Sequence, residues 1–159
     1  MMGRDFTDPQ DKFFEDFELG DTMTTRGRTV DIGDITNFAG LTGDHYQLHT
    51  DARFMADNRF GQRIAHGPLT FSLAVGLIGL SGFYGNAIAA LVEITGLKAT
   101  APVFAGDTVH VVATVKVHEA TGPKYGTLGV EYSVRNQEGE EVMTFLQTML
   151  AKRRTNGDA

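Results

Sequence analysis

The sequence predicts an α+β fold in which a mainly antiparallel sheet wraps around one long central helix. The first observation is an apolar segment, residues 68–80, with large aliphatic or aromatic side chains on almost every helical face. A helix on a protein surface shows one polar side, so this one is expected to be buried. The second observation is the period-two alternation of apolar and polar residues over 107–118 and 127–135. That period indicates half-buried strands, and a helix packed on such strands gives the predicted layout.

The composition fits a single domain. The chain has 159 residues, of which 42% are hydrophobic. A chain of this size buries about 70% of the surface that it exposes when unfolded, so it needs no covalent cross-links to fold. We expect a loose lead-in at 1–12, one domain at 13–154 and a short tail at 155–159, with no internal repeats or linkers. The first residues expected to dock are aromatic or aliphatic: Phe13, Phe14, Phe17 and Leu19.

The N-terminal half is expected to hold a short strand over 22–29 and then a helix. From Val30 to Leu41 apolar residues recur every three positions, and Asp31 is suited to cap the start. A further helical turn or two is expected over 51–58, followed by a loop that leads to the buried helix.

The C-terminal half is expected to supply the rest of the sheet. Residues 87–100 fit either a helix or a strand by pattern alone. The segment 142–151 is more evenly apolar, as a central or interface strand would be. Gly122-Pro123 and Glu138-Gly139 supply turns on either side of the 127–135 strand.

Charge and cysteine content exclude several classes of function. The formal charge is −6, with 14 basic and 20 acidic residues, which argues against nonspecific binding to nucleic acid or to an anionic membrane. The chain has no cysteine, so disulfides, thiolate metal sites and thiol nucleophiles are absent. Residues 1–16 lack the apolar core of a signal peptide, and the run at 69–80 is too short to span a bilayer. We therefore expect a cytoplasmic protein.

An aspartate and a histidine lie close together in a segment with turn chemistry. In Thr42-Gly-Asp-His-Tyr-Gln-Leu-His, His49 follows Asp44 by five residues, which is not the spacing of neighbours on one helical face. An irregular loop can still fold the two around one water molecule, which suits general acid and base chemistry near neutral pH. The alternative is a polar turn in which Asp44 caps backbone amides and His49 is a surface ring.

A helix start follows at His66-Gly67-Pro68. Proline is favourable in the first helical turn. A helix start has free N–H groups and partial positive charge, so the Gly67 amide is placed to stabilise negative charge on a carbonyl oxygen. The alternative is that Gly67 only permits a tight entry into a buried helix. We expect no metal, because His45 and His49, although four apart, are predicted to lie in a loop with no third ligand nearby.

These segments together resemble a known motif. FAGLTGDHYQLHTD at 38–51 and IAHGPL at 64–69, with similarity also over 30–41 and 102–107, resemble the hydratase motif of the MaoC-like dehydratases. This is the (R)-specific enoyl-CoA hydratase group of hot-dog proteins. The resemblance implies a hot-dog domain, a strand rather than a helix at 87–100, and a homodimer or larger homo-oligomer whose active site lies between subunits.

The resemblance also implies a reaction and residue roles. Asp44 and His49 would activate a water that adds across the double bond of a 2-enoyl-CoA, while the Gly67 amide binds the thioester oxygen. No cofactor is implied, and Tyr46 and His66 are the candidate substrate-binding residues. Tyr46-Gln47 stand where the family usually has Asn-Pro, and Val75 stands where a helix serine often helps to hold the aspartate.

Two other functions fit the same residues: a hot-dog thioesterase, which directs water at the thioester carbonyl, and a non-catalytic acyl-CoA-binding subunit. Two basic groups are candidates either for the phosphates of coenzyme A or for solvated surface charge. They are Arg53, Arg59 and Arg63 near the motif, and Lys152, Arg153 and Arg154 after the last strand. The candidate residues for an acyl tunnel are Tyr46, Phe54, Phe60, Phe83 and Tyr84.

Overall fold

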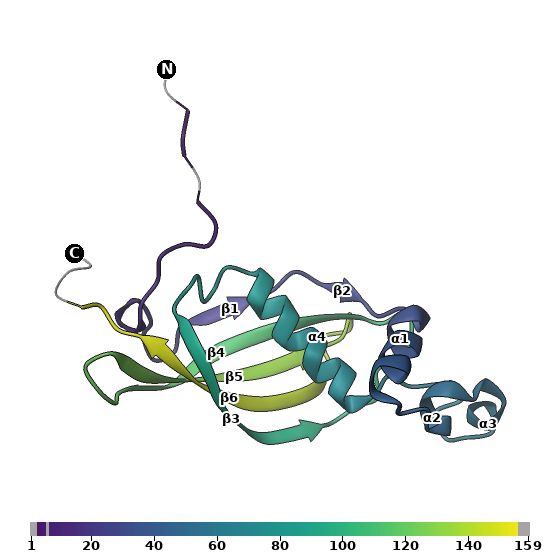
Figure 1. Ribbon diagram of the computed structural model, residues 1–159. Coiled ribbons are helices and arrows are strands. Elements are labelled where there is room, and N and C mark those ends of the chain that lie inside the picture. The colour runs from purple at the N-terminus through teal and green to yellow at the C-terminus, as the bar shows by residue number, and fades with distance from the viewer. Residues whose placement is uncertain (1–2, 6, 156–159) are drawn as a thin grey trace.

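A curved antiparallel sheet packs against one long helix, α4 (Gly67–Leu80), which lies along its concave face (Figure 1). The computed structural model describes residues 3–5 and 7–155. The predicted tail at 155–159 therefore lies, apart from Thr155, outside the described residues. The predicted α+β layout is confirmed.

The sheet is built from four long strands and two short ones. The long strands are β3 (Ile88–Ala99), β4 (Thr108–Ala120), β5 (Tyr125–Arg135) and β6 (Glu141–Lys152). The short strands are β1 (Thr22–Thr24) and β2 (Arg28–Thr29). The order across the sheet is β1-β4-β5-β6-β3, with β2 also paired to β4, and all neighbours are antiparallel. Residues 87–100 thus form a strand, as the family resemblance implies. The evenly apolar segment at 142–151 is central, between β5 and β3, as its composition predicts.

The core lies between α4 and the inner face of the sheet. On β4 and β5 every second residue points toward the helix and is buried, which confirms the period-two pattern. These residues are Val109, Val111, Ala113, Val115, Leu128, Val130, Tyr132 and Val134. Opposite them, α4 buries Leu69, Ala74, Leu77 and Ile78.

The sheet covers only one side of α4. The opposite side, which was expected to be wrapped as well, remains open within the protomer. Gly76 and Gly79 are exposed there, and Leu80 retains 81% of its accessible surface. The sheet therefore buries only part of the apolar surface of this helix.

The N-terminal region differs from expectation in three places. The predicted strand over 22–29 is two strands, β1 (Thr22–Thr24) and β2 (Arg28–Thr29), because the Thr25 hydroxyl between them accepts the Val111 N–H at 3.0 Å. Leu19 is 65% exposed and does not dock, whereas Phe14 and Phe17 are buried around a short 3₁₀ helix, η1 (Phe14–Asp16).

The lead-in makes contacts before residue 13. The Lys12 backbone N–H donates to Asn86 Oδ1 at 3.0 Å, and the Asn86 backbone N–H donates to the Gln10 carbonyl oxygen at 3.1 Å. Residues 10–12 are thus held against the turn that follows α4, and the docked part of the chain begins a few residues earlier than predicted.

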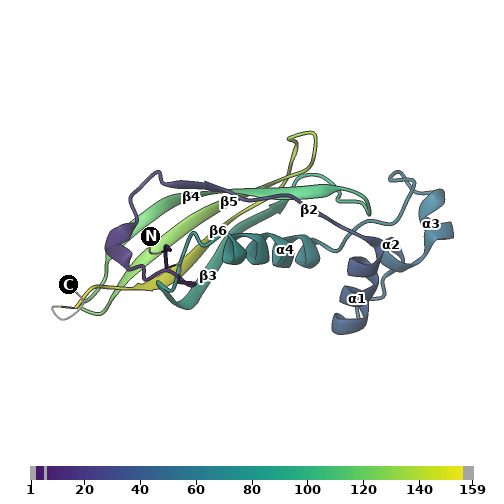
Figure 2. The ribbon, with the colours of Figure 1, turned by 90° about the horizontal axis from the view of Figure 1, so that it is seen from above.

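Three helices gather beyond the N-terminal end of α4, at one end of the molecule (Figure 2). They are α1 (Ile32–Thr42), α2 (Gln47–Thr50) and α3 (Ala52–Ala56). Asp31 is the N-cap of α1 as predicted, and Asp34 accepts its backbone N–H at 2.9 Å. No helix among the described residues is long and apolar enough to cross a membrane.

Candidate active site

The end of α1 directs the chain into the candidate site. Gly43 ends the helix with a left-handed backbone (φ 77°), and its N–H donates to the Ala39 carbonyl at 2.8 Å. Glycine adopts this conformation without the steric cost that a Cβ brings. The next residue, Asp44, is exposed, and its Oδ1 accepts the Tyr46 N–H at 3.3 Å. The carboxylate therefore caps a backbone amide, and it also lies beside two histidines.

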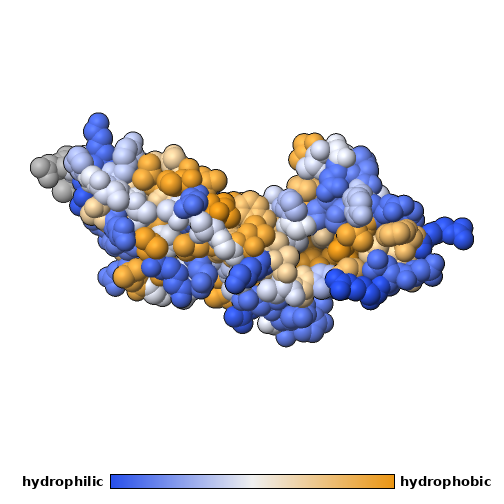
Figure 3. Space-filling view, turned by 90° about the horizontal axis from the view of Figure 1, so that it is seen from below, coloured by the Kyte–Doolittle hydropathy of each residue, from blue (hydrophilic) through white to orange (hydrophobic). Residues whose placement is uncertain are grey.

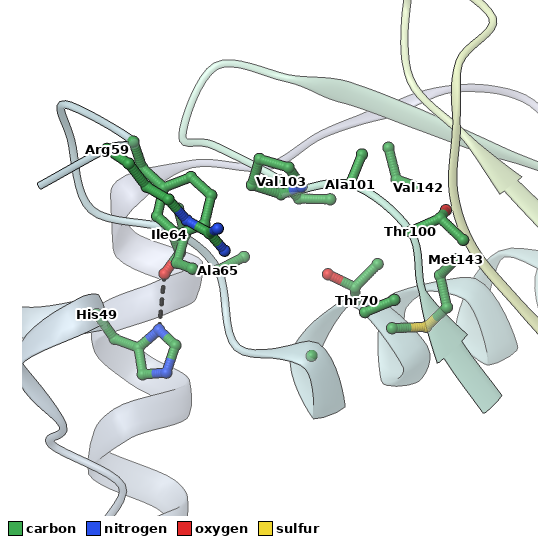
Figure 4. A pocket seen from close by; sticks show the side chains of 14 residues that line it. His49, Arg59, Ile64, Ala65, Thr70, Thr100, Ala101, Val103, Val142 and Met143 are labelled. Atoms are coloured by element: carbon green, nitrogen blue, oxygen red, sulfur yellow. Dashed lines mark hydrogen bonds between the residues drawn. The ribbon is translucent and has the colours of Figure 1, made fainter.

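His49 lies on α2, not in the loop that the sequence predicted. One helical turn of four residues is too short to show a periodic pattern. The His49 Nδ1 lies 2.8 Å from the Ile64 carbonyl oxygen (Figure 4). Because a carbonyl only accepts, the proton of the neutral ring sits on Nδ1 and leaves the Nε2 lone pair free. A ring oriented in this way is suited to take a proton from water.

His66 connects the two predicted catalytic residues. Its ring is fully buried, and its Nε2 lies 3.0 Å from the Asp44 carbonyl oxygen, to which it donates. The same ring stacks on that of His49, with 3.7 Å between centroids and 24° between planes. Its Nδ1 has no hydrogen-bond partner among the described residues. The Phe38 ring of α1 also packs against the His66 ring, with 5.0 Å between the two centroids.

Asp44, His49 and His66 form the one group among the described residues whose ligand atoms lie close enough to hold a metal, all within 4.8 Å. The sequence-based expectation of no metal considered His45 with His49, rather than His66, and identified no third ligand. The ring geometry still favours that expectation. An imidazole binds a metal through a lone pair in its ring plane, and these two planes are nearly parallel, so their lone pairs do not converge on one ion.

Gly67 is the first residue of α4, with His66 as its N-cap and Pro68 next. The first backbone hydrogen bond of the helix runs from Thr70 to the His66 carbonyl at 3.1 Å, so the helix does not use the Gly67 N–H. No atom lies within 4 Å of the position that a Cβ on Gly67 would occupy. A small side chain would therefore fit at this position, and the amide lies at the positive end of the helix dipole.

Gly67 and His49 line the same cavity, whose volume is about 280 Å³. Figure 4 shows its walls, which come from segments far apart in the sequence. The Ala65 N–H donates to the Val103 carbonyl at 2.7 Å and a bridge pairs Ile64 with Phe104, which brings two of these segments together. The remaining lining residues are Arg59, Phe60, Ile64, Ala65, Thr70, Ala99, Thr100, Ala101, Pro102, Val103, Val142 and Met143.

Most of this lining escaped sequence reasoning. Of the five candidate tunnel residues, Phe60 alone lines the cavity. Tyr46 is 63% exposed, and Phe83 packs against Phe17 in the core. The similarity over 102–107 was the one sequence signal for the wall formed by Pro102 and Val103.

Val75 lies in the second half of α4 and packs against the core. It is eight residues beyond Gly67, about two helical turns, so a side chain at this position is remote from Asp44. The groups that hold the Asp44 backbone are instead His66 and the Thr42 hydroxyl, which accepts the Asp44 N–H at 3.2 Å.

The basic residues fall into three settings. Arg59 lines the cavity. Arg63 lines a separate, smaller cavity on which His49 also borders, with a volume of about 220 Å³. At the other end of the chain, Arg153 and Arg154 pair with acidic residues of η1 at 3.0 and 2.6 Å. The C-terminal arginines therefore already have internal partners, which weakens their candidacy for binding a phosphate.

The family model described as "MaoC like domain" matches residues 16–136. The protein named Protein MaoC from Klebsiella aerogenes is 36% identical over 116 residues, which is 73% of this chain and 34% of that protein. The chain thus spans about a third of the length of this relative. The (R)-specific enoyl-CoA hydratase from Rhodospirillum rubrum is 33% identical over 108 residues, 65% of this chain and 69% of that enzyme.

Solved structures share the fold over nearly the whole chain. The monoamine oxidase regulatory protein from Archaeoglobus fulgidus has a TM-score of 0.88 and 31% identity, covering 94% of this chain and 100% of that one. A Mycobacterium tuberculosis protein described as having a double hot-dog fold has a TM-score of 0.77 and 17% identity, covering 91% of this chain and 45% of that one. The present fold is a hot-dog fold.

Proposed function

Because the chain belongs to the MaoC-like dehydratase family, we propose that it catalyses the reversible hydration of a 2-enoyl thioester, presented as an acyl-CoA, to the 3-hydroxyacyl thioester. The observation that carries this proposal is one arrangement. The Asp44 carboxylate and the His49 ring lie within 4.8 Å, and His49 shares a cavity with the unused N–H of Gly67. A water-activating pair beside an oxyanion site is what addition of water to an enoyl thioester requires.

In the proposed mechanism, Asp44 and His49 hold one water molecule. One of the two takes a proton from this water, and His49 Nε2 is free to do so because Nδ1–H donates to Ile64. The hydroxyl oxygen then bonds to the β-carbon, and the electron pair of the double bond moves toward the thioester oxygen. The Gly67 amide stabilises that oxygen, and the Asp44–His49 pair returns the proton taken from the water to the α-carbon, which completes the addition.

His66 was predicted to bind substrate, but its full burial favours a different role. We propose that it positions the catalytic pair, because it holds the Asp44 backbone and supports the His49 ring. Tyr46 stays a candidate for substrate contact, since it is exposed and adjacent to the site.

We further propose that the protein is a homodimer. β3 is an edge strand of the sheet, so one side of its backbone is unpaired within the protomer. It carries three exposed aliphatic side chains, Leu91, Val92 and Leu97, at 59%, 57% and 46%. Figure 3 views the molecule from the side on which β3 lies in Figure 1 and shows apolar residues spread along it. A second copy would cover this strand and the open side of α4.

No cofactor enters the proposed reaction, because only water and protons move. A cytoplasmic location belongs to the same proposal, and the absence of cysteine is compatible with a reducing compartment.

The test follows the ultraviolet absorbance of crotonyl-CoA, a conjugated short-chain enoyl-CoA, with a thiol reagent in a parallel cuvette. A fall in absorbance without release of thiol supports hydration. Release of thiol would replace the proposal with a thioesterase. Binding of crotonyl-CoA with neither signal would replace it with a non-catalytic acyl-CoA-binding protein. The similar Archaeoglobus protein is named a regulatory protein, so binding of crotonyl-CoA should be measured as well as its turnover.

A further inference from the structure

Arg59 is the one residue with a permanent charge among those that line the cavity. The other walls are apolar or carry hydroxyl groups, apart from His49. Figure 4 shows the Arg59 side chain extending toward the cavity from the loop after α3. None of the ion pairs found among the described residues involves Arg59. A guanidinium that faces a substrate cavity without an internal carboxylate is available to an anion of the ligand.

The local structure fixes the backbone around Arg59, whose side chain is exposed. Its neighbour Asn58 anchors a tight turn: the Asn58 Oδ1 accepts the Phe60 N–H at 3.3 Å, and the Asn58 carbonyl accepts the Gly61 N–H at 2.9 Å. The Met55 side chain just before the turn is fully buried. The Arg59 guanidinium itself lies 4.5 Å from the centroid of the Phe60 ring, within the range of a cation–π contact. This order reduces the entropy lost when the guanidinium binds an anion.

We propose that Arg59 binds a carboxylate on the acyl chain, so that the preferred substrate is a 2-enoyl thioester carrying a second, ionised carboxyl group. The inference rests on the proposed function, whose substrate class it specifies. A guanidinium pairs with a carboxylate through two parallel hydrogen bonds, which adds directional selectivity to the charge interaction. A methyl group in the same place would leave that charge without a partner.

The phosphates of coenzyme A offer the other anion, and the position of Arg59 in the cavity wall favours the carboxylate. Arg59, His49 and Gly67 border one cavity of about 280 Å³, so the guanidinium faces the same space as the proposed reacting groups. The pantetheine arm, when extended, separates the thioester from the nearest phosphate by two amide units and a cysteamine. A carboxylate a few bonds beyond the double bond can share this cavity with the thioester without such a separation.

The experiment measures binding of two saturated, unreactive thioesters, succinyl-CoA and butyryl-CoA, by titration calorimetry. They have the same number of acyl carbons and differ in a terminal carboxylate against a methyl. The wild-type protein is expected to bind succinyl-CoA about ten- to a hundredfold more tightly, the scale of a charge-assisted hydrogen-bonded pair. In Arg59→Ala the ratio of the two Kd values falls toward one, and Arg59→Lys, which keeps the charge without the planar fork, gives an intermediate ratio.

Arg53→Ala is the matched control. Arg53 is also exposed and lies six residues away on α3, but it lines no part of the cavity, so this variant should retain the wild-type ratio. A wild-type ratio near one would overturn the inference. So would an equal loss of both ligands in Arg59→Ala, which would assign the anion to the coenzyme. Hydration of crotonyl-CoA tests the proposed function separately, because the binding ratio requires no turnover.

Discussion

The imidazole rings of His49 and His66 lie face to face, 3.7 Å apart and 24° from parallel. This contact joins two segments that the sequence separates by sixteen residues. His66 also donates to the Asp44 backbone carbonyl at 3.0 Å, so one buried ring fixes the positions of both predicted catalytic residues. The proposed acid and base therefore depend for their positions on a third residue, His66, which is not among the residues that line the cavity.

Replacing His66 tests this positioning role. His66→Phe keeps a flat ring beside His49 but cannot donate to Asp44, so kcat for crotonyl-CoA should fall about three- to tenfold, the scale of one hydrogen bond, with little change in KM. His66→Gln restores a donor and should recover part of kcat. Steady-state kinetics with both variants checks this. A rise in KM at constant kcat would return His66 to direct substrate binding.

Removing the Asp44 carboxylate tests the chemistry. In Asp44→Asn, kcat should fall at least about a hundredfold, because general acid and base groups contribute about 10²–10⁴-fold. Asp44 is exposed, so the variant should unfold at the same temperature as the wild type. Asp57→Asn, an exposed aspartate at the end of α3, is the matched control and should retain full activity. Retained activity in Asp44→Asn would remove this residue from the mechanism.

The Gly67 amide can be deleted without deleting the helix start. Proline suits the first helical position, and the His66 backbone before it (φ −61°, ψ 140°) has the extended conformation that precedes proline. Gly67→Pro should therefore lose about 10²–10³-fold in kcat, the contribution of one oxyanion donor. Because the new proline directly precedes Pro68, a thermal melt is needed to check that this variant folds. Gly67→Ala adds bulk, for which there is open space, but keeps the N–H. Equal kinetics in the two variants would exclude the amide as the oxyanion donor.

The sequence predicted the elements whose side-chain pattern repeats over several turns or strand residues. The three-residue recurrence before Leu41 gave α1, and alternation gave β4 and β5. The prediction from sequence was wrong where a single hydrogen bond interrupts a strand. The Thr25 hydroxyl, by accepting the Val111 N–H, divides one predicted strand into two, and nothing in the local pattern signals that bond.

Some residues of the candidate site were likewise predictable from the sequence and others were not. The motif predicted Asp44, His49 and Gly67 as site residues. The structure places Asp44 beside His49, and His49 lines one cavity with Gly67. The role of His66 depends on a hydrogen bond to a residue twenty-two positions away, and the cavity wall at Met143 depends on sheet pairing with β3. Such neighbours are set by tertiary packing, which spacing along the chain does not encode. The sequence offered Arg59 only as one of several basic residues for the phosphates of coenzyme A, and the cavity lining then separated it from Arg53 and Arg63.

The open strand edge predicts a dimer that one charge can break. We expect light scattering at micromolar concentration to give twice the protomer mass. Leu91→Glu places a charge on the exposed face of β3 and should lower the mass to that of the protomer, because a charge on an edge opposes strand pairing. Leu19→Glu, the same change at a leucine that is 65% exposed, should leave the dimer intact. A monomeric wild type would contradict the proposed assembly.

The ion pair between Asp16 and Arg154 predicts a pH-dependent part of the stability. The hydrogen bond from Arg154 lowers the pKa of Asp16 below its ordinary value of 3.8, aided by the Phe13 amide and opposed by desolvation. A carboxyl with a lowered folded-state pKa stabilises the protein above its unfolded-state pKa, and this contribution is lost as the pH falls through the folded-state value.

Asp16→Asn should accordingly reduce the free energy of unfolding by at most about 1 kcal/mol at neutral pH, since both side chains are partly exposed. The difference from the wild type should shrink as the pH falls below about 4 and also in high salt, because protonation removes the charge and counterions screen it. Thermal melts across this pH range check both trends. Asp57→Asn, which has no ion pair among the described residues, should show neither trend. A constant difference at all pH values would mean that Asp16 acts through packing or its backbone hydrogen bond rather than through charge.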